Sequence, residues 1–535
     1  MGKIKKIISG MLAAIFACAF AACAPAKAGD APDYSAYSDR FSYYAYNPPN
    51  SGTWRDMQNH IMYAGEDFRT VARYREYKDC GFDILMLQTS GNYYGQAWET
   101  CDTKLLMDRA QEAGIDKVIV TDNRLQILSR GYAYVDEAGN GKYNGATFVD
   151  LCDEAHLAID PCPSLIGAGK PFADEDALDK YVAACMEPYR THPVFYGVQL
   201  FDEPRKQHIA AYGEVYRAIK RVCPEAFAQY NLFQMHIDSD SPGDVEKKYE
   251  NVCPAVEGEF ANNDERAAAM YEAYVKAFAE STGADYVMMD SYPLLGSGVR
   301  ECYIRNMQIC AEVGKEMGID FASVVQTFSD YRPNGSVVTR RLNEAGARWL
   351  NNMQLGFGVK QIVYYTYWSK GKTGSFGTDD KGSFITLYGE KTALYGIMQK
   401  IMAENQTFAN TILQFDYVTS NVYTVKPSVY SVSHASMASE GKAYQKVKNV
   451  AINKECALVT ELHDDENERY MYMVQNIVDP VYQGANAYQT ATVTFKKGFT
   501  HALVYKNGTV ETVKLQNGKY TVKQHAGEAV FILPY

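Results

Sequence analysis

The sequence has little histidine, no paired-cysteine motif and no excess of positive charge, and each of these shortages argues against one class of protein. Only nine of the 535 residues are histidine, and none ends an apolar run, which argues against a metal-dependent hydrolase. The twelve cysteines include no Cys-x-x-Cys pair, so we expect no structural zinc. The formal net charge of −11 argues against a nucleic-acid partner. We therefore expect no metal and no cofactor.

The N-terminus carries an apolar run, from Ile7 to Phe20, that follows three lysines. This run is too short for a membrane span and is typical of an export signal. Small residues at positions 21 and 22 then precede Cys23, a pattern that resembles the lipobox of bacterial lipoproteins. The resemblance implies cleavage before Cys23 and diacylation of its thiol, which would anchor the protein to the extracellular face of the bacterial cell membrane. The alternative is an ordinary signal peptide, cut near Ala28.

The segment that follows the predicted signal peptide (residues 1–23) is small and polar. We expect residues 24–40 to form a flexible tether. Export also permits disulfide bonds, and Cys152 and Cys162 are the pair that we would test first.

Between residue 41 and about residue 410, short apolar runs alternate with helical patterns. Eight such runs lie at 41–46, 82–88, 117–122, 196–203, 226–233, 285–293, 321–328 and 361–368. The segments between them carry apolar residues at three- and four-residue spacing, and Gly81, Gly114 and Gly318 stand where helices should end. Eight strand–helix units predict a (β/α)8 TIM barrel over 41–410. A doubly wound open sheet is the alternative, but no Gly-x-Gly-x-x-Gly loop follows an early run.

The last 125 residues no longer show the alternation of apolar runs and helical patterns. Polar turns separate β-rich segments, and two Asn-Gly pairs, at Asn507 and Asn517, are strong hairpin signals. Residues 411–535 therefore predict a C-terminal antiparallel β-sandwich that packs against the barrel.

In a TIM barrel the catalytic groups lie at the carboxyl ends of the strands, so the residues that end each run are the candidate site. The candidates for substrate binding are Tyr46, Gln88, Asp122, Asn231, Tyr292, Gln326, Tyr365 and Trp368. Several of these have structural alternatives. Asp122 could cap the next helix, and Trp368 could be a hydrophobic lid rather than a stacking platform. Gln88, Asn231 and Gln326 could form hydrogen bonds only with other residues at the barrel mouth. An oligosaccharide or polysaccharide is the partner that such a set suits.

The most specific motif is Asp202-Glu203-Pro204 at the end of the fourth run. Two adjacent acids close an otherwise neutral strand, and neighbouring strand residues point to opposite faces. We expect one acid to face the barrel mouth and the other to support it. A partly desolvated glutamate has a raised pKa and can protonate a glycosidic oxygen, so Glu203 is the predicted general acid. The alternative is that both acids cap the next helix or pair with Arg205.

A strand-four acid followed by proline is similar to the Asn-Glu-Pro of the large clan of retaining TIM-barrel glycosidases. The resemblance implies a glycoside hydrolase of extracellular glycans with Glu203 as acid/base. Two positions depart from the pattern: Asp202 stands in place of asparagine, and strand seven offers Gln326 in place of the nucleophilic glutamate. A glutamine cannot be a carboxylate nucleophile.

Two mechanisms would account for these departures. In the first, Asp202 and Glu203 resemble the acid pair of β-N-acetylhexosaminidases and β-N-acetylgalactosaminidases, in which the acetamido group of the substrate attacks and a tyrosine, here Tyr292 or Tyr365, helps to hold it. In the second, Asp290 acts with Glu203 as base or nucleophile. A carboxylate separation of about 5–5.5 Å would indicate retention, and about 6.5–9.5 Å inversion.

Two other classes of protein stay open. A catalytically inactive barrel could act as a surface glycan-binding lipoprotein, which the missing strand-seven glutamate favours. A solute-binding lipoprotein would need two α/β lobes with a hinge, rather than eight consecutive units and a β-rich tail.

Overall fold

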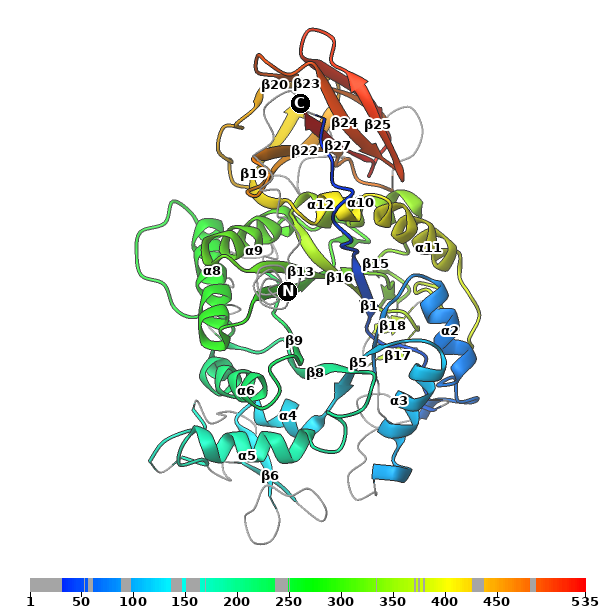
Figure 1. The fold of residues 1–535 in the computed structure, drawn as a ribbon, viewed down its shortest axis with the longest axis vertical. Helices are drawn as coiled ribbons and strands as arrows, with labels where there is room; N and C mark the ends of the chain where they lie inside the picture. Colours follow the sequence, from blue (N-terminus) through cyan, green and yellow to red (C-terminus); the bar gives the residue numbers. More distant parts are fainter. Residues whose placement is uncertain are drawn as a thin grey trace, which may run out of the picture.

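The computed structural model contains an α/β region and, above it in Figure 1, a region of antiparallel strands. The described residues are 31–51, 53–55, 61–87, 98–135, 147–150, 164–168, 170–235, 249, 251–332, 334–369, 372–373, 376–378, 381–425, 437–481 and 487–535. Within these ranges no helix has the length and apolar character needed to cross a bilayer. Cys23, Gln88, Cys152 and Cys162 lie outside them, and so do the predictions that rest on these four residues.

Two four-stranded parallel sheets form the centre of the α/β region. One has the order β1 (Ser42–Ala45), β16 (Val359–Tyr365), β13 (Asp320–Gln326), β10 (Tyr286–Ser291), and the other β4 (Ile84–Met86), β5 (Lys117–Thr121), β8 (Phe195–Asp202), β9 (Phe227–Asn231). Each of these eight strands overlaps one of the eight predicted runs. They are rich in Val, Ile and Tyr without strict alternation, as suits strands covered on their outer face.

The two sheets meet at both edges, although their ladders are not continuous. After β9, Leu232 forms an isolated parallel bridge with Met289 of β10. Before β4, the Asp83 N–H donates to the carbonyl of Tyr43 on β1 (3.1 Å). The parallel α/β architecture of the prediction is therefore present, in two sheets rather than one.

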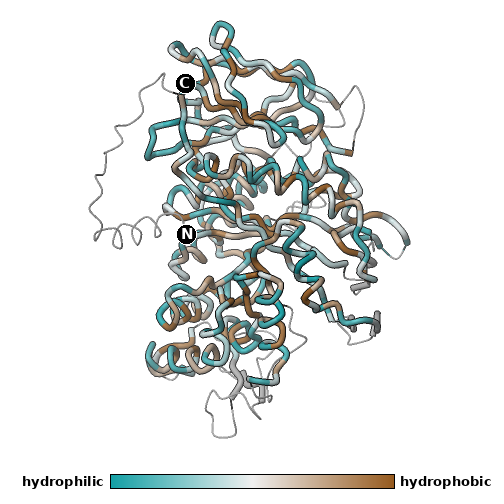
Figure 2. Tube along the Cα trace, turned by 45° about the vertical axis from the view of Figure 1, so that its right-hand side comes forward, coloured by the Kyte–Doolittle hydropathy of each residue, from teal (hydrophilic) through white to brown (hydrophobic). Residues whose placement is uncertain are grey.

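Helices surround the parallel strands (Figure 1). They are α2 (Val71–Asp79), α3 (Asp102–Glu112), α5 (Glu175–Met186), α6 (Ile209–Val222), α8 (Asn263–Thr282), α9 (Tyr303–Met317), α10 (Glu344–Gly356) and α11 (Ala393–Gln406), with shorter α4 (Asn123–Leu128) and α12 (Ala409–Ile412). Polar side chains cap many of them; Asn262 accepts from the Glu265 N–H and begins α8. Gly318 ends α9 in the left-handed region (φ 67°), as predicted. Figure 2 shows hydrophobic residues along the central strands, alternating with hydrophilic ones on the helices.

A six-stranded antiparallel sheet lies at the carboxyl ends of β10, β13 and β16, because its strands come from the segments that directly follow them. Its order is β12 (Gly298–Val299), β11 (Leu294–Leu295), β15 (Val337–Thr339), β14 (Asp330–Tyr331), β18 (Phe376–Thr378), β17 (Lys372–Thr373). Two hairpins, β2 (Thr53–Arg55) with β3 (Ile61–Ala64) and β6 (Tyr132–Val135) with β7 (Thr147–Asp150), complete the region. The sequence analysis did not predict these short strands.

The C-terminal region consists of two antiparallel sheets. Their orders are β19 (Asp416–Val425), β21 (Glu455–Asp464), β22 (Arg469–Asn476), β27 (Ala529–Pro534), β24 (His501–Lys506), β25 (Thr509–Lys514), and β20 (Val447–Ile452), β23 (Gln489–Phe495), β26 (Lys519–Gln524). Buried residues of both sheets, among them Val474 and Val493, share one cluster. Asn507 and Asn517 adopt left-handed backbones (φ 49° and 54°), as the predicted Asn-Gly turns require.

The N-terminal segment packs against the C-terminal strands from Tyr34 onward. Tyr34 is 5% exposed, and its hydroxyl donates to Asp464 (2.8 Å). Asn467 donates to the Tyr37 hydroxyl (3.1 Å). This end of the segment predicted as a flexible tether is therefore held in place, because its tyrosines bury their rings and find polar partners.

Candidate active site

Three carboxylates gather where neighbouring parallel strands end. Asp202 is the last residue of β8 and stands beside Asn231, the last residue of β9, while Asp290 lies near the end of β10. The Asp202 carboxylate accepts hydrogen bonds from Asn231 (3.1 Å) and the Tyr46 hydroxyl (3.4 Å). Asp290 is 3% exposed, Glu203 is half-buried and Asp202 is exposed, so the cluster runs from the core to the surface.

Glu203 turns toward the same cluster as Asp202, which differs from the alternation expected of strand neighbours. The β8–β9 register shifts between Gln199 and Asp202, and Glu203 leaves the strand with a left-handed backbone (φ 51°). Its N–H donates to the Asn231 carbonyl (3.0 Å), and its carboxyl group lies close enough to Asp290 and Asp202 for their negative charges to raise its pKa. Both acids of the motif therefore face the site, because the regular strand geometry ends between them.

Burial and neighbouring negative charge raise the pKa of both Glu203 and Asp290. For Glu203 burial is the largest cause, followed by the charges of Asp290 and Asp202. For Asp290 burial is again the largest cause, with Asp202 second. Hydrogen bonds from Tyr292, Asn231 and Glu203 favour the ionised form of Asp290 and lower its pKa in part. The raised pKa of Glu203 favours its protonated form near neutral pH, as a general acid requires.

An aromatic cluster borders the carboxylates. Tyr292 stacks on Tyr365 with ring centroids 5.4 Å apart, and Phe328 stands edge-on to both rings, at 5.0 and 5.2 Å. Tyr46 contacts Tyr365 edge-on at 5.7 Å. Tyr292 and Tyr365 are partly exposed, so the cluster offers amphipathic rings beside the acid pair. Phe328 was missed by the sequence analysis, although it closes the seventh run two residues after Gln326.

Acceptor oxygens without donors are concentrated in the same place. Gln229 Oε1, Asn231 Oδ1 and Asp290 Oδ1 are buried and have no hydrogen-bond partner. Gln229, also missed, lies two residues before Asn231 on β9, and its amide donates to the Tyr46 hydroxyl (2.9 Å). A cluster of buried acceptors suits a ligand that brings O–H or N–H donors. Among the residues that the structure describes, no three His, Cys, Asp or Glu side chains are grouped to hold a metal ion.

Asp122 lies outside this cluster and serves the fold. It caps α4 by accepting from the Arg124 N–H, is 1% exposed, and pairs with the Arg124 guanidinium (2.6 Å) and the Tyr189 hydroxyl (2.9 Å). Asp122 is therefore a helix cap, as the alternative proposed, because these partners occupy its carboxylate.

Trp368 and Gln326 are also committed to internal contacts. Trp368 is fully buried, packs on Phe68 with ring centroids 4.7 Å apart, and so presents no free face for a sugar. Gln326 is fully buried and its side-chain amide bonds to the backbone of Leu294 (3.0 and 3.1 Å). Neither side chain contacts the carboxylates. Trp368 is a hydrophobic packing residue, as the alternative proposed, and not a stacking platform.

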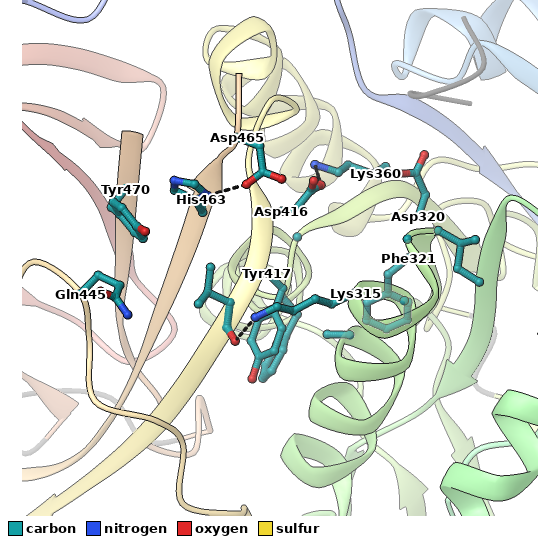
Figure 3. Close-up of a pocket in the computed structure, with 17 residues that line it drawn as sticks. Lys315, Asp320, Phe321, Lys360, Asp416, Tyr417, Gln445, His463, Asp465 and Tyr470 are labelled. Carbon is teal, nitrogen blue, oxygen red and sulfur yellow. Dashed lines mark hydrogen bonds and ion pairs between the residues drawn. The ribbon is translucent and has the colours of Figure 1, made fainter. Parts of the chain in front are cut away.

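A separate cavity of about 260 Å³ lies between α9, the start of β13 and the C-terminal strands (Figure 3). Its charged groups largely pair with one another: Lys360 with Asp416 (3.1 Å) and His463 with Asp465 (2.6 Å). Asp320, the first residue of β13, lines it, which places the cavity at the amino ends of the parallel strands. The carboxylate cluster stands at the opposite ends of those strands.

No protein-family model matches the sequence, and no curated protein matches it. Solved structures to which the chain is similar are glycoside hydrolases. An α-amylase from Anoxybacillus is 11% identical over 94% of this chain and 99% of that chain, with a TM-score of 0.45. A family 5 glycoside hydrolase from Bacteroides vulgatus is 9% identical over 87% and 85%, with a TM-score of 0.42. A family 30 endoxylanase from Clostridium papyrosolvens is 11% identical over 93% and 97%, with a TM-score of 0.37. Likenesses this distant do not define a shared active site, so the roles of individual residues rest on the geometry above.

Proposed function

We propose that the protein is a glycoside hydrolase in which Glu203 protonates the glycosidic oxygen. The observation that carries this proposal is the gathering of Glu203, Asp290 and Asp202 at the carboxyl ends of β8 to β10, where burial and neighbouring negative charge raise the pKa of Glu203. Burial and two neighbouring carboxylates keep the proton on Glu203 near neutral pH, which is what a general acid requires. The half-buried tyrosines and the unpartnered acceptors supply rings and hydrogen-bond acceptors that suit a sugar.

The proposal includes the arrangement of the fold. The two parallel sheets act as the halves of one (β/α)8 barrel over residues 41–410, and residues 411–535 form a β-sandwich. The contacts at both sheet edges, Leu232 with Met289 and Asp83 with Tyr43, support this assignment. Export and a lipid anchor at Cys23, with the protein on the extracellular face of the membrane, complete the proposal and rest on the sequence pattern alone.

The end of strand seven favours substrate assistance over a two-carboxylate mechanism. Gln326 is fully buried there and its amide bonds to the backbone of Leu294, so this strand supplies no carboxylate nucleophile. Asp290 is 3% exposed, and burial and the charge of Asp202 raise its pKa, which suits a group that supports Glu203 rather than one that attacks the sugar. Another nucleophile is needed, and the 2-acetamido group of an N-acetylhexosaminide can supply it.

In this mechanism the acetamido carbonyl oxygen attacks the anomeric carbon while the glycosidic bond breaks. The proton of Glu203 goes to the leaving oxygen. Asp202, which Tyr46 and Asn231 hold by hydrogen bonds, accepts a hydrogen bond from the acetamido N–H and stabilises the positive charge of the cyclic intermediate. Water then adds to the anomeric carbon, returns a proton to Glu203 and restores the acetamido group. Tyr292 and Tyr365 flank the substrate.

The proposal is tested with the soluble form that lacks residues 1–23, on a panel of aryl glycosides that includes N-acetylhexosaminides. Glu203→Gln is expected to lower kcat by about 10²–10⁴-fold, and Asp202→Asn to lower activity on acetamido sugars. Asp465→Asn is the matched control, because this exposed acid lies in the separate cavity. Activity only on sugars without an acetamido group would contradict substrate assistance. If no glycoside is cleaved but glycans bind equally to wild type and Glu203→Gln, the protein is a glycan-binding lipoprotein instead.

A further inference from the structure

Gln326 holds the backbone of the segment that follows β10. Its Oε1 accepts from the Leu294 N–H (3.0 Å), and its Nε2 donates to the carbonyls of Leu294 (3.1 Å) and Arg340 (3.4 Å). A carboxylate of the same size could accept but not donate, and it would face two carbonyl oxygens. The geometry therefore requires an amide at this position.

Arg340 connects the same segment to the C-terminal strands. Its backbone N–H donates to the Leu294 carbonyl (2.9 Å), and its Nη1 donates to Asp479 Oδ1 (2.8 Å). The two side chains are only 15% and 8% exposed. Asp479 follows β22 and also accepts from the Val481 N–H (3.0 Å), so its carboxylate is held from its own side. A part-buried, charge-assisted bond of this kind fixes geometry more firmly than a surface ion pair does.

Leu294 is separated from Tyr292 only by Pro293, whose ring fixes its own φ. A displacement of Leu294 therefore moves Tyr292. Tyr292 stacks on Tyr365 and lies two residues after Asp290; burial and the charge of Asp290 raise the pKa of the Tyr292 hydroxyl. Hydrogen bonds and the short segment from Tyr292 to Leu294 thus connect Asp479, through Arg340, to the surroundings of the carboxyl pair.

We propose that Gln326, Arg340 and Asp479 form a brace through which the C-terminal strands position Tyr292 against the Glu203–Asp290 pair. The three are positioning residues, since none of them touches the pair. The brace gives the C-terminal region a part in the activity and explains why strand seven ends in glutamine. Its kinetic consequence rests on the proposed function, whereas its structural consequence does not.

The test compares Asp479→Ala with Glu404→Ala. Glu404 pairs with Arg348 (2.7 Å; 16% and 10% exposed) on the outer helices, so its loss breaks an ion pair of similar burial away from Tyr292. Asp479→Ala is expected to lower kcat by about 10- to 100-fold, with a smaller change in KM. The acidic limb of the pH profile of this variant should move to higher pH, because a displaced Tyr292 no longer lowers the pKa of Asp290. Asp479→Asn, which keeps the acceptor for Arg340, should restore most of kcat, and Glu404→Ala should leave kcat and the pH profile unchanged.

Crystal structures of the same variants supply a readout that is independent of activity. The Tyr292 ring should leave its stack on Tyr365 in Asp479→Ala and in Gln326→Glu, and should keep it in Glu404→Ala. An unmoved Tyr292 in both brace variants would overturn the proposal, and so would equal kinetic effects of Asp479→Ala and Glu404→Ala. If wild type cleaves no glycoside, the proposed function fails while the position of Tyr292 still decides the brace. Gln326→Glu keeps the test available should Asp479→Ala fail to fold.

Discussion

At the scale of the residue, Glu203 and Asp290 are two carboxyl groups in a partly buried cluster, and burial and neighbouring negative charge raise the pKa of both. Protonation of one of them avoids two adjacent charges, which would cost far more than one. The same arrangement makes the folded state favour protonated Glu203 at a pH where the unfolded chain would ionise it. Activity and stability are therefore linked through this one group.

Glu203→Gln is expected to raise stability near neutral pH and above. The folded-state pKa of Glu203 is raised above its unfolded value of about 4.3, so its stabilising contribution is full below that value and is lost as pH rises through the folded pKa. A neutral amide does not titrate and removes this loss, which we expect to be about 1–3 kcal/mol. Thermal unfolding of wild type and variant between pH 4 and pH 9 (about the range over which the pair titrates) measures it. Stability curves of wild type and variant that run parallel across that range would contradict the raised pKa of Glu203.

The residue scale also marks the limit of prediction from sequence. The position of Asp202 and Glu203 at a strand end followed from an apolar run closed by two acids and a proline. The left-handed backbone of Glu203 could not be predicted, because glutamate rarely adopts that conformation and its residue type gives no sign of it. Gln326 ends β13 and Trp368 ends the eighth run, as site residues would, and only the three-dimensional packing shows that their partners are internal.

At the scale of the element, α4 begins at a capping carboxylate that is also half of a buried ion pair. Asp122→Ala should cost about 3–5 kcal/mol, because it removes the cap and leaves the Arg124 guanidinium buried beside Tyr189 without its partner. Asp174→Ala is the matched control, since Asp174 caps α5 in the same way but is exposed; it should cost about 1 kcal/mol. Denaturant unfolding measures both. Equal losses would show that the ion pair adds nothing to the cap.

Element prediction succeeded where the pattern was long and failed where it was short. The eight parallel strands lie in continuous apolar runs, and helices such as α9 show clear spacing and a glycine stop. The six-stranded sheet at the carboxyl ends of β10, β13 and β16 was not predicted, because strands such as β11 and β14 span two residues each and carry no period. This sheet holds Leu294, and Arg340 directly follows its strand β15, so the sequence did not predict the brace either.

At the scale of the whole molecule, the α/β and antiparallel regions share one hydrophobic core. Met473 and Phe531 of the C-terminal strands belong to the same buried cluster as Trp349 of α10, and Gln475 donates to the Trp349 carbonyl (2.9 Å). A shared core of this kind couples the stability of its two sides. We therefore expect a single cooperative unfolding transition.

Gly527→Ala tests this junction. Gly527 has a left-handed backbone (φ 85°), and an added Cβ would lie 2.3 Å from the Ala345 carbonyl oxygen of α10. Gly518→Ala is the control, because its backbone is similar (φ 70°) while the nearest atom would lie at 3.6 Å. The control should lose about 1 kcal/mol from backbone strain alone, and Gly527→Ala at least about 2 kcal/mol more from the clash. Calorimetry that gave equal losses would contradict a tight junction.

The central claim is that Glu203 donates the proton to the leaving group, and the dependence of rate on the leaving group tests it most directly. Wild type and Glu203→Gln are compared on a series of aryl N-acetylhexosaminides whose phenols range from weakly to strongly acidic. An acidic phenol leaves without help, so the loss in kcat/KM caused by Glu203→Gln should be small there and should grow toward 10²–10⁴-fold, roughly, for the poorest leaving groups. A loss of the same size across the whole series would contradict the claim that Glu203 is the general acid.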